Sequence, residues 1–348
     1  MSAELTIGKR SIGTAHPPFV IAELSGNHNR SLERAIALVE AAASAGADAI
    51  KLQTYTADTL TMPGVHRIDN PESPWNGREL HELYAEASTP WEWHETIFTR
   101  AQQLGMLAFS SPFDESAVDF LETLDVPAYK IASFENEHYP LIRKAVASGK
   151  PLIMSTGVIG RTALDESVSY LRKVGCTGFA LLKCTSTYPA STSTINLHTI
   201  ADLRDRYHCH VGLSDHTLGI GVPVAAVALG ARIIEKHLTL CRADGGVDSS
   251  FSLEPGELAA LVTESHRAWE ALGKVTYDLS EKDQAQIIFK RSIYAARALP
   301  AGHRIGENDL RVIRPSNGLH PRHYERILGL ALLKPIGEGE PLREDHLP

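Results

Sequence analysis

Short apolar runs alternate with longer amphipathic segments along the first three quarters of the chain. Runs such as Phe19–Ser25 are rich in branched and aromatic residues, as is typical of buried strands. The segments between them repeat apolar residues at helical spacing, and Ser31 stands where an N-cap would precede Leu32–Ala45. The expected strands are Phe19–Ser25, Ala49–Thr54, Met106–Ser110, Ala128–Ile131, Leu152–Ser155, Phe179–Lys183, His210–Leu213 and Arg232–His237. The helices expected after them are Leu32–Ala45, Trp91–Leu104, Glu115–Leu124, Tyr139–Ser148, Leu164–Val174, Leu197–Tyr207, Ile220–Leu229 and Pro255–Leu272.

A strand followed by a helix, repeated eight times before Gly273, predicts parallel strands joined by right-handed crossovers. Eight units in about 255 residues match an α/β fold of the (β/α)8 TIM-barrel type. A doubly wound open sheet is the alternative. That fold usually has fewer units and often a GxGxxG turn after its first strand, whereas the first strand here runs into SGNHN.

The pattern changes after Gly273. Residues 274–290 are polar and predict a linker with some helix. Beyond them, AGHRIGENDL (Ala301–Leu310) resembles EGEPLREDHL (Glu338–Leu347), which predicts a small pseudo-symmetric domain of short strands and turns. We therefore predict a barrel domain over 1–273, a linker over 274–290 and a second domain over 291–348.

Composition and charge narrow the function. With 43% hydrophobic and 22% charged residues, the chain has ordinary globular composition. A net charge of −8 argues against nucleic-acid binding, although residues 285–348 hold ten Lys and Arg against seven Asp and Glu. No apolar run approaches the ~20 residues of a membrane helix, and the N-terminus lacks a signal pattern, so we expect a cytoplasmic protein. No two of the four cysteines form a CxxC pair, so the sequence indicates neither a disulfide framework nor a cysteine zinc site.

Polar residues stand at the ends of several predicted strands, where TIM barrels carry their active sites. Lys51 and Lys130 interrupt apolar strands and would point inward, where a buried cation requires an anionic partner. Together with Ser133, Ser155 and Ser214, they predict a phosphate or carboxylate site.

Two histidines, His216 and His237, end adjacent strands and can share one divalent metal ion. Two protein ligands leave coordination positions open for water or substrate. The carboxylates of Glu23, Glu135 and Glu235 are expected nearby as ligands or as partners of ligands.

These motifs, in this order and over nearly the whole chain, resemble the sialic acid synthase family. The segments that carry the resemblance are AELSGNHN (Ala22–Asn29), KLQTYT (Lys51–Thr56), TPWEWH (Thr89–His94), FSSPFD (Phe109–Asp114), YKIASFE (Tyr129–Glu135), STG (Ser155–Gly157), GLSDHT (Gly212–Thr217) and EKHLT (Glu235–Thr239). The tail, with RSIYAAR (Arg291–Arg297) and RPSNGLHP (Arg314–Pro321), is similar to that family's antifreeze-like (SAF) domain. AELS, KLQTYT, TPWEWH and ASFE are most similar to the pseudaminic acid synthase branch.

The resemblance implies that phosphoenolpyruvate condenses with an open-chain N-acetylated amino sugar, and that phosphate leaves by C–O cleavage. The implied cofactor is a divalent metal, Mn²⁺ first, with Mg²⁺ or Co²⁺ as alternatives. The implied sugar is 2,4-diacetamido-2,4,6-trideoxy-L-altrose, and the product pseudaminic acid. A different amino sugar, as in the N-acetylneuraminate and legionaminate branches, is the alternative.

The family's functional positions are carried over residue by residue. Those that bind phosphoenolpyruvate correspond to Lys51, Lys130, Ser133, Ser155 and Ser214, with Gln53 beside them. The metal ligands correspond to His216 and His237, and the sugar contacts to Tyr188, Asp248 and Arg314. Glu23 and Glu135 correspond to carboxylates near the reacting centre, with Glu135 the first candidate for general base and Glu23 the second. In the family the tail, with its arginine, caps the partner's barrel, which implies a domain-swapped homodimer.

Two other functions compete with this one. A Schiff-base aldolase would use Lys51 or Lys130 as its nucleophile. A non-catalytic barrel would bind an anion and use its tail as an interaction module, but it would not need the carboxylates and histidines that are present here.

The sequence departs from the family at three positions. Gly26 stands where the pseudaminic branch more often has Ala, and Asn76 where it often has Asp. Arg30 replaces the Gly that follows NHN in the N-acetylneuraminate branch. None of these belongs to the predicted metal or phosphate site, so the reaction class is unaffected. Asn76 lies in the long second loop, where it would bear on the identity of the sugar.

Overall fold

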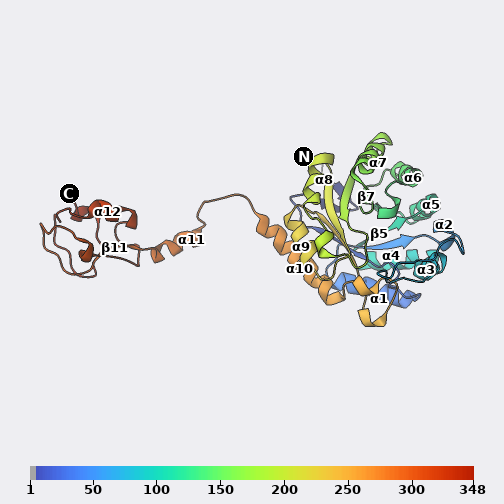
Figure 1. The fold of residues 1–348 in the computed structure, drawn as a ribbon, viewed down its shortest axis with the longest axis horizontal. Helices are drawn as coiled ribbons and strands as arrows, with labels where there is room; N and C mark the ends of the chain where they lie inside the picture. Colours follow the sequence, from blue (N-terminus) through green and yellow to red (C-terminus); the bar gives the residue numbers. More distant parts are fainter. Residues whose placement is uncertain (1–4) are drawn as a thin grey trace. The chain divides into compact units, whose positions relative to one another are not determined.

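Eight parallel strands close into a barrel in the first part of the molecule (Figure 1). The computed structural model describes residues 5–348, so residues 1–4 of the predicted barrel domain lie outside the described residues. The chain divides into two units, with the boundary between Gly273 and Lys274. The barrel strands are β3 (Phe19–Glu23), β4 (Ala49–Thr54), β5 (Leu107–Pro112), β6 (Tyr129–Ile131), β7 (Leu152–Ser155), β8 (Phe179–Cys184), β9 (His210–Asp215) and β10 (Ile233–His237). They pair in chain order, and β10 closes the barrel on β3, which confirms the predicted TIM barrel.

Helices follow the strands and surround the barrel (Figure 1). They are α1 (Leu32–Ser44), α4 (His94–Gln103), α5 (Glu115–Thr123), α6 (Tyr139–Ala147), α7 (Arg161–Lys173), α8 (Thr199–Tyr207), α9 (Gly221–Ala228) and α10 (Pro255–Leu272). The side chain of Ser31 caps α1 by accepting a hydrogen bond from the Arg34 amide at 3.1 Å. The buried residues of α1, including Leu38 and Val39, join the main hydrophobic core. Within residues 5–348, no helix is both long and apolar enough to cross a membrane.

The strand register brings polar residues of neighbouring strands side by side. Glu23 at the end of β3 is paired with Lys51 of β4 on one side and with His237 of β10 on the other. Glu235 of β10 lies opposite Ser214 of β9. Because the strands are parallel, these residues gather at one end of the barrel.

Several elements of the first unit were not predicted. An antiparallel hairpin of β1 (Leu5–Ile7) and β2 (Arg10–Ile12) precedes the barrel. Its tight turn uses Gly8 at a φ of +57°, a conformation that glycine adopts without strain. The long second loop contains two helices for which no prediction was made, α2 (Ala57–Leu60) and α3 (Leu80–Ala87).

The second unit has its own small hydrophobic core. Its elements are α11 (Glu281–Gln286), β11 (Ser292–Ala295), β12 (Leu310–Ile313) and α12 (Tyr324–Ile327), with β11 and β12 antiparallel. The two repeated segments end alike, each with a single 3₁₀ turn before a buried leucine, Leu310 or Leu347. The predicted pseudo-symmetry is therefore visible in the structure.

Candidate active site

A cavity of about 330 Å³ opens at the carboxyl ends of the barrel strands. Its walls contain most of the predicted site residues, namely Lys51, Gln53, Lys130, Ser133, Glu135, Ser155, Tyr188, Ser214, His216, His237 and Asp248. Glu23 contacts Lys51 directly and is buried. The strand-end rule, by which polar residues at the carboxyl ends of barrel strands form the active site, thus selected residues that the fold brings to one place.

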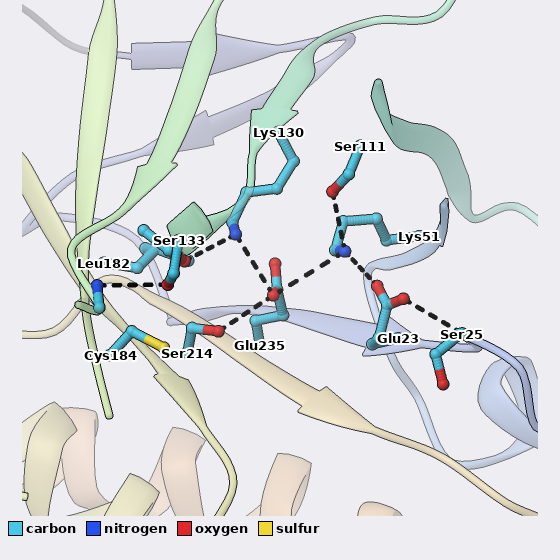
Figure 2. Close-up of polar contacts among 12 residues, drawn as sticks. Glu23, Ser25, Lys51, Ser111, Lys130, Ser133, Leu182, Cys184, Ser214 and Glu235 are labelled. Atoms are coloured by element: carbon cyan, nitrogen blue, oxygen red, sulfur yellow. Dashed lines mark hydrogen bonds and ion pairs between the residues drawn. The ribbon is translucent and has the colours of Figure 1, made fainter. Parts of the chain in front are cut away.

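Two buried lysines share one carboxylate in this cavity (Figure 2). Lys130 Nζ lies 3.5 Å from Glu235 Oε1, and Lys51 Nζ lies 3.9 Å from the same oxygen. Lys51 also forms a close ion pair with Glu23. Ser214 Oγ donates to Glu235 Oε1 at 3.1 Å, so a single carboxylate oxygen faces two ammonium groups and a hydroxyl.

Burial and mutual attraction set the pKa values of these groups. Burial raises the pKa of Glu23 above its ordinary value, despite the opposing attraction of Lys51. At Glu235 burial acts in the same sense, but Lys130 and Lys51 outweigh it and lower the pKa. Burial lowers the pKa of Lys130, while at Lys51 the carboxylates of Glu23 and Glu235 overcome burial and raise the pKa. In the free site the charges of two lysines and two carboxylates balance.

The serines extend this network around the cavity. Lys51 Nζ donates to Ser111 Oγ at 3.1 Å, and Lys130 Nζ donates to Ser155 Oγ at 2.7 Å. Ser133 Oγ accepts from the Gly157 amide at 3.2 Å. A Cβ atom on Gly157 would lie 2.6 Å from Ser133 Oγ, so the close approach of these loops requires a glycine. The ammonium and hydroxyl groups form a cradle suited to an anion.

Glu135 is a carboxylate of a different kind. It lies in a 3₁₀ turn, Ser133–Glu135, directly after β6, and lines the cavity. Burial raises its pKa to about 7, which Lys130 only partly opposes. Its Oε2 atom is buried and accepts no hydrogen bond from any residue within 5–348. A carboxylate with a free oxygen and a near-neutral pKa is well placed to exchange protons with a ligand.

The two predicted metal ligands lie next to each other in the wall of the cavity. The ring centroids of His216 and His237 are 5.3 Å apart. His216 Nδ1 lies 3.0 Å from the carbonyl oxygen of Thr185, and His237 Nδ1 lies 3.2 Å from Ser25 Oγ. These contacts orient both rings and leave each Nε2 as the nitrogen for a metal. Burial lowers the pKa of His237 well below its ordinary value, which keeps that ring neutral.

Across residues 5–348, no group of three or more His, Cys, Asp and Glu side chains is arranged to hold a metal ion. The role of His216 and His237 as ligands of a metal ion therefore stays a prediction, with two imidazoles as its donor set. Such a set fits an ion that also binds water or substrate.

An apolar wall lines the cavity on the side of the second loop, and the sequence analysis missed it. Its residues are Leu60, Ile68, Trp75, Leu80, Leu83 and Tyr84. Trp75 Nε1 donates to the carbonyl oxygen of Val247 at 2.8 Å, and the Trp75 ring lies 5.4 Å from that of Tyr188. The only signal in the sequence was a lone tryptophan in a polar loop. Its neighbour Asn76 does not line the cavity but accepts from the Asn70 amide at 2.9 Å.

Arg314, the remaining predicted sugar contact, lies in the second unit. It is exposed and follows β12 directly, and its peptide bond to Pro315 is cis. Its role toward the sugar stays a prediction.

Comparison with known proteins identifies the family of this chain. Residues 38–277 match the NeuB family, and residues 290–348 match the SAF domain. The chain is 43% identical to the pseudaminic acid synthase of Campylobacter jejuni, over 94% of this chain and 95% of that protein. It is 35% identical to the N,N'-diacetyllegionaminic acid synthase of Legionella pneumophila, over 98% and 97%. This chain belongs to the NeuB family and ends in a SAF domain.

A solved structure supports the same relationship. The N-acetylneuraminic acid synthetase of Leptospira borgpetersenii, crystallised with citrate, superposes with a TM-score of 0.74. It is 34% identical in sequence, and the alignment covers 82% of this chain and 96% of that one. The barrel fold and the family assignment thus have independent support.

Proposed function

We propose that this protein is a metal-dependent synthase that condenses phosphoenolpyruvate with 2,4-diacetamido-2,4,6-trideoxy-L-altrose and water. The products are pseudaminic acid and phosphate. The observation that carries the proposal is the cavity in which Lys51 and Lys130 share Glu235. The 43% identity to a pseudaminic acid synthase supports this reaction and this sugar.

Phosphoenolpyruvate would bind among the lysines and serines. Its carboxylate and phosphate bring several negative charges, and the two ammonium groups with Ser133, Ser155 and Ser214 supply matching donors. Gln53 adds an amide donor at the same wall. On binding, the lysines would exchange part of their contact with Glu235 and Glu23 for contact with the substrate.

The reaction makes one C–C bond and breaks one C–O bond. The enol C3 of phosphoenolpyruvate attacks the aldehyde carbon of the sugar, and the aldehyde oxygen takes up a proton. Water adds to C2 and gives a proton to a general base. The resulting tetrahedral centre expels phosphate, and its C2 hydroxyl becomes the new ketone.

Glu135 is our candidate for the base that accepts the proton from water, and Glu23 is the second candidate. Glu135 has a free Oε2 atom and a pKa of about 7, so the carboxylate form is available near neutral pH. Glu23 is less available, because it is paired with Lys51 and accepts from the Ser25 amide at 3.1 Å.

His216 and His237 would hold the divalent ion through their Nε2 atoms, and we propose Mn²⁺ first, with Mg²⁺ or Co²⁺ as alternatives. The bound ion would polarise the aldehyde oxygen of the sugar. Its two histidines stay oriented through the Thr185 carbonyl and the Ser25 hydroxyl.

The sugar would lie between the anion cradle and the apolar wall. Tyr188 and the buried Asp248 line this part of the cavity and are candidates to bind its hydroxyl and acetamido groups. The wall that includes Trp75 and Tyr84 suits the acetamido methyl groups and the C6 methyl group of a 6-deoxy sugar. A legionaminate synthase is the second candidate, supported by the 35% identity to such an enzyme.

We also propose a domain-swapped homodimer that works in the cytoplasm. In it, the SAF domain of one subunit would present Arg314 to the sugar in the barrel of the other. The basic excess of residues 285–348 against an acidic barrel supports this pairing.

The test is phosphate release from phosphoenolpyruvate with Mn²⁺, measured in parallel with three sugars and checked by product mass. The sugars are 2,4-diacetamido-2,4,6-trideoxy-L-altrose, 2,4-diacetamido-2,4,6-trideoxy-D-mannose and N-acetylmannosamine. We expect strong turnover with the first alone. Preference for either of the others would contradict the proposed sugar while keeping the chemistry. If neither phosphoenolpyruvate nor the metal ion binds, the assignment of the protein as an enzyme is contradicted.

A further inference from the structure

Ser25 lies two residues beyond β3 with its backbone in the left-handed region, at a φ of +41°. Residues with a Cβ atom rarely adopt this conformation, and such strain often accompanies a function. Ser25 is the second residue of a tight turn, in which the Asn27 amide donates to the Leu24 carbonyl oxygen at 3.1 Å. A glycine would make this turn without strain. The presence of a serine therefore points to a use of its hydroxyl group.

Ser25 is only 1% exposed, and it contacts three residues of the candidate active site. Its amide donates to Glu23 Oε1 at 3.1 Å (Figure 2). Its Oγ atom lies 3.2 Å from His237 Nδ1. Its hydroxyl group and the Gly26 amide also face the carboxylate of Asp248, where both oppose the rise in pKa that burial causes. One strained residue thus joins the candidate base, a predicted metal ligand and a predicted sugar contact.

The chemistry of these groups fixes the direction of the two hydroxyl contacts. His237 Nδ1 and Asp248 Oδ2 are 3.9 Å apart, which is too far for a direct hydrogen bond. A hydroxyl group has one proton to donate and lone pairs to accept with, whereas a carboxylate only accepts. Ser25 therefore donates to Asp248 and accepts from His237 Nδ1–H. In the neutral ring this order leaves Nε2 without a proton, as a metal ligand must be.

We propose that Ser25 is a positioning residue whose hydroxyl group holds His237 and Asp248 in one hydrogen-bonded row. Asp248 then has a second role besides binding the sugar, because through Ser25 it selects the tautomer of His237 that can bind a metal ion. The inference rests on the proposed function, in which His237 binds the divalent ion and Asp248 the amino sugar. Loss of a hydrogen bond that orients a histidine ligand typically lowers metal affinity about 10- to 100-fold.

The experiment titrates Mn²⁺ alone into the full chain and follows the free ion by its EPR signal. Ser25→Ala should raise the Kd for Mn²⁺ roughly 10-fold or more, because the acceptor for His237 Nδ1–H is lost. Ser25→Gly should bind Mn²⁺ as weakly as Ser25→Ala but unfold at a higher temperature than that variant, because glycine adopts the left-handed conformation without strain. The pair separates the hydroxyl group from the backbone, and Ser25→Gly serves alone should Ser25→Ala fail to fold.

Ser110→Ala is the matched control. Ser110 is fully buried, and its Oγ atom lies 2.6 Å from Thr54 Oγ1. Its neighbour Ser111 lines the active-site cavity, and successive side chains of a strand point to opposite faces. The control therefore removes a buried hydroxyl group from the other face of β5, and it should leave the Kd for Mn²⁺ unchanged.

Steady-state kinetics give the second readout. Ser25→Ala should raise KM for the amino sugar several-fold, because Asp248 loses a hydrogen bond that orients it, and leave KM for phosphoenolpyruvate unchanged. The inference is overturned, with the proposed function intact, if the wild type binds Mn²⁺ and Ser25→Ala binds it equally well. It is also overturned if Ser110→Ala weakens binding as much as Ser25→Ala does. A wild-type protein that does not bind Mn²⁺ contradicts the proposed metal site itself, and this inference with it.

Discussion

Buried lysines lie on both faces of the barrel sheet, and their ion pairs differ between the two faces. On β10, Lys236 is fully buried and pairs with Asp215 Oδ2 at 2.6 Å. It also contacts the Thr217 carbonyl oxygen, and Asp215 accepts two hydrogen bonds from Thr217. In the cavity, Lys130 shares Glu235 with Lys51 at longer distances. Lys236 and Asp215 satisfy each other at short range, whereas the longer contacts of Lys130 and Lys51 with Glu235 leave both lysines able to bind another anion.

This difference shows that burial of a charge does not by itself mark a catalytic group. Lys236 has a dedicated partner and no access to a cavity, so its role is structural. Lys130 and Lys51 line a cavity and divide one carboxylate oxygen between them. The incomplete pairing, rather than the burial, indicates the substrate site.

Lys130→Met should have the largest effect on activity. It removes an ammonium group proposed to bind phosphoenolpyruvate, and we expect kcat/KM for phosphoenolpyruvate to fall about 1,000-fold. The protein should remain folded, because Glu235 keeps its contacts with Lys51 and Ser214. Steady-state kinetics and thermal unfolding of the same sample measure both. Activity near that of the wild type would contradict the assignment of this lysine.

Lys236→Met should lower the stability of the protein, whereas Lys130→Met lowers its activity. It leaves the Asp215 carboxylate buried without its cation, a loss of about 3–5 kcal/mol in the free energy of unfolding. Denaturant titration measures the loss. The double variant Lys236→Met with Asp215→Leu is the control, and it should recover much of the stability because no charge is left unpaired. If the single variant were as stable as the wild type, the ion pair would not have the structural role we give it.

Glu135→Gln should lower kcat about 100-fold and change its pH dependence. The pKa of Glu135 is raised to about 7, so the carboxylate that can accept a proton forms as the pH rises through that value. The wild-type rate should therefore increase with pH through about 7, and the variant should lose this rise. Glu23→Gln is the comparison. An unchanged profile in Glu135→Gln, with loss of turnover in Glu23→Gln, would transfer the role of base to Glu23.

Trp75→Ala should have the smallest effect, confined to the sugar. Removal of the ring from the apolar wall should raise KM for the amino sugar about 10-fold and leave KM for phosphoenolpyruvate unchanged. Trp75→Phe keeps most of the apolar surface but loses the hydrogen bond to Val247, so it separates the two contributions. Equal changes in both KM values would place this side chain outside the sugar site.

The sequence predicted the barrel and the cradle because both follow from local patterns. Alternation of strands and helices identified the fold, and the strand-end rule then brought Lys51, Lys130 and His237 together without knowledge of their contacts. Glu235 was expected near the metal ligands, yet its contact with two lysines depends on how three strands close around it.

Contacts between distant segments escaped prediction for physical reasons. Trp75 reaches Val247 across 172 positions of the chain, and no local period encodes such a contact. The β1–β2 hairpin was missed because its strands of three residues are too short to show an alternation.

The most direct test of the proposed condensation follows the bridging oxygen atom of phosphoenolpyruvate. Phosphoenolpyruvate labelled with ¹⁸O at the bridging position would be turned over with the amino sugar, and the released phosphate analysed by ³¹P NMR. Attack of water at C2 breaks the C–O bond, so we expect the label to leave with phosphate while the sugar acid gains its ketone oxygen from water. Unlabelled phosphate, with the label kept in the organic product, would mean that the P–O bond breaks and would contradict the condensation proposed for this site.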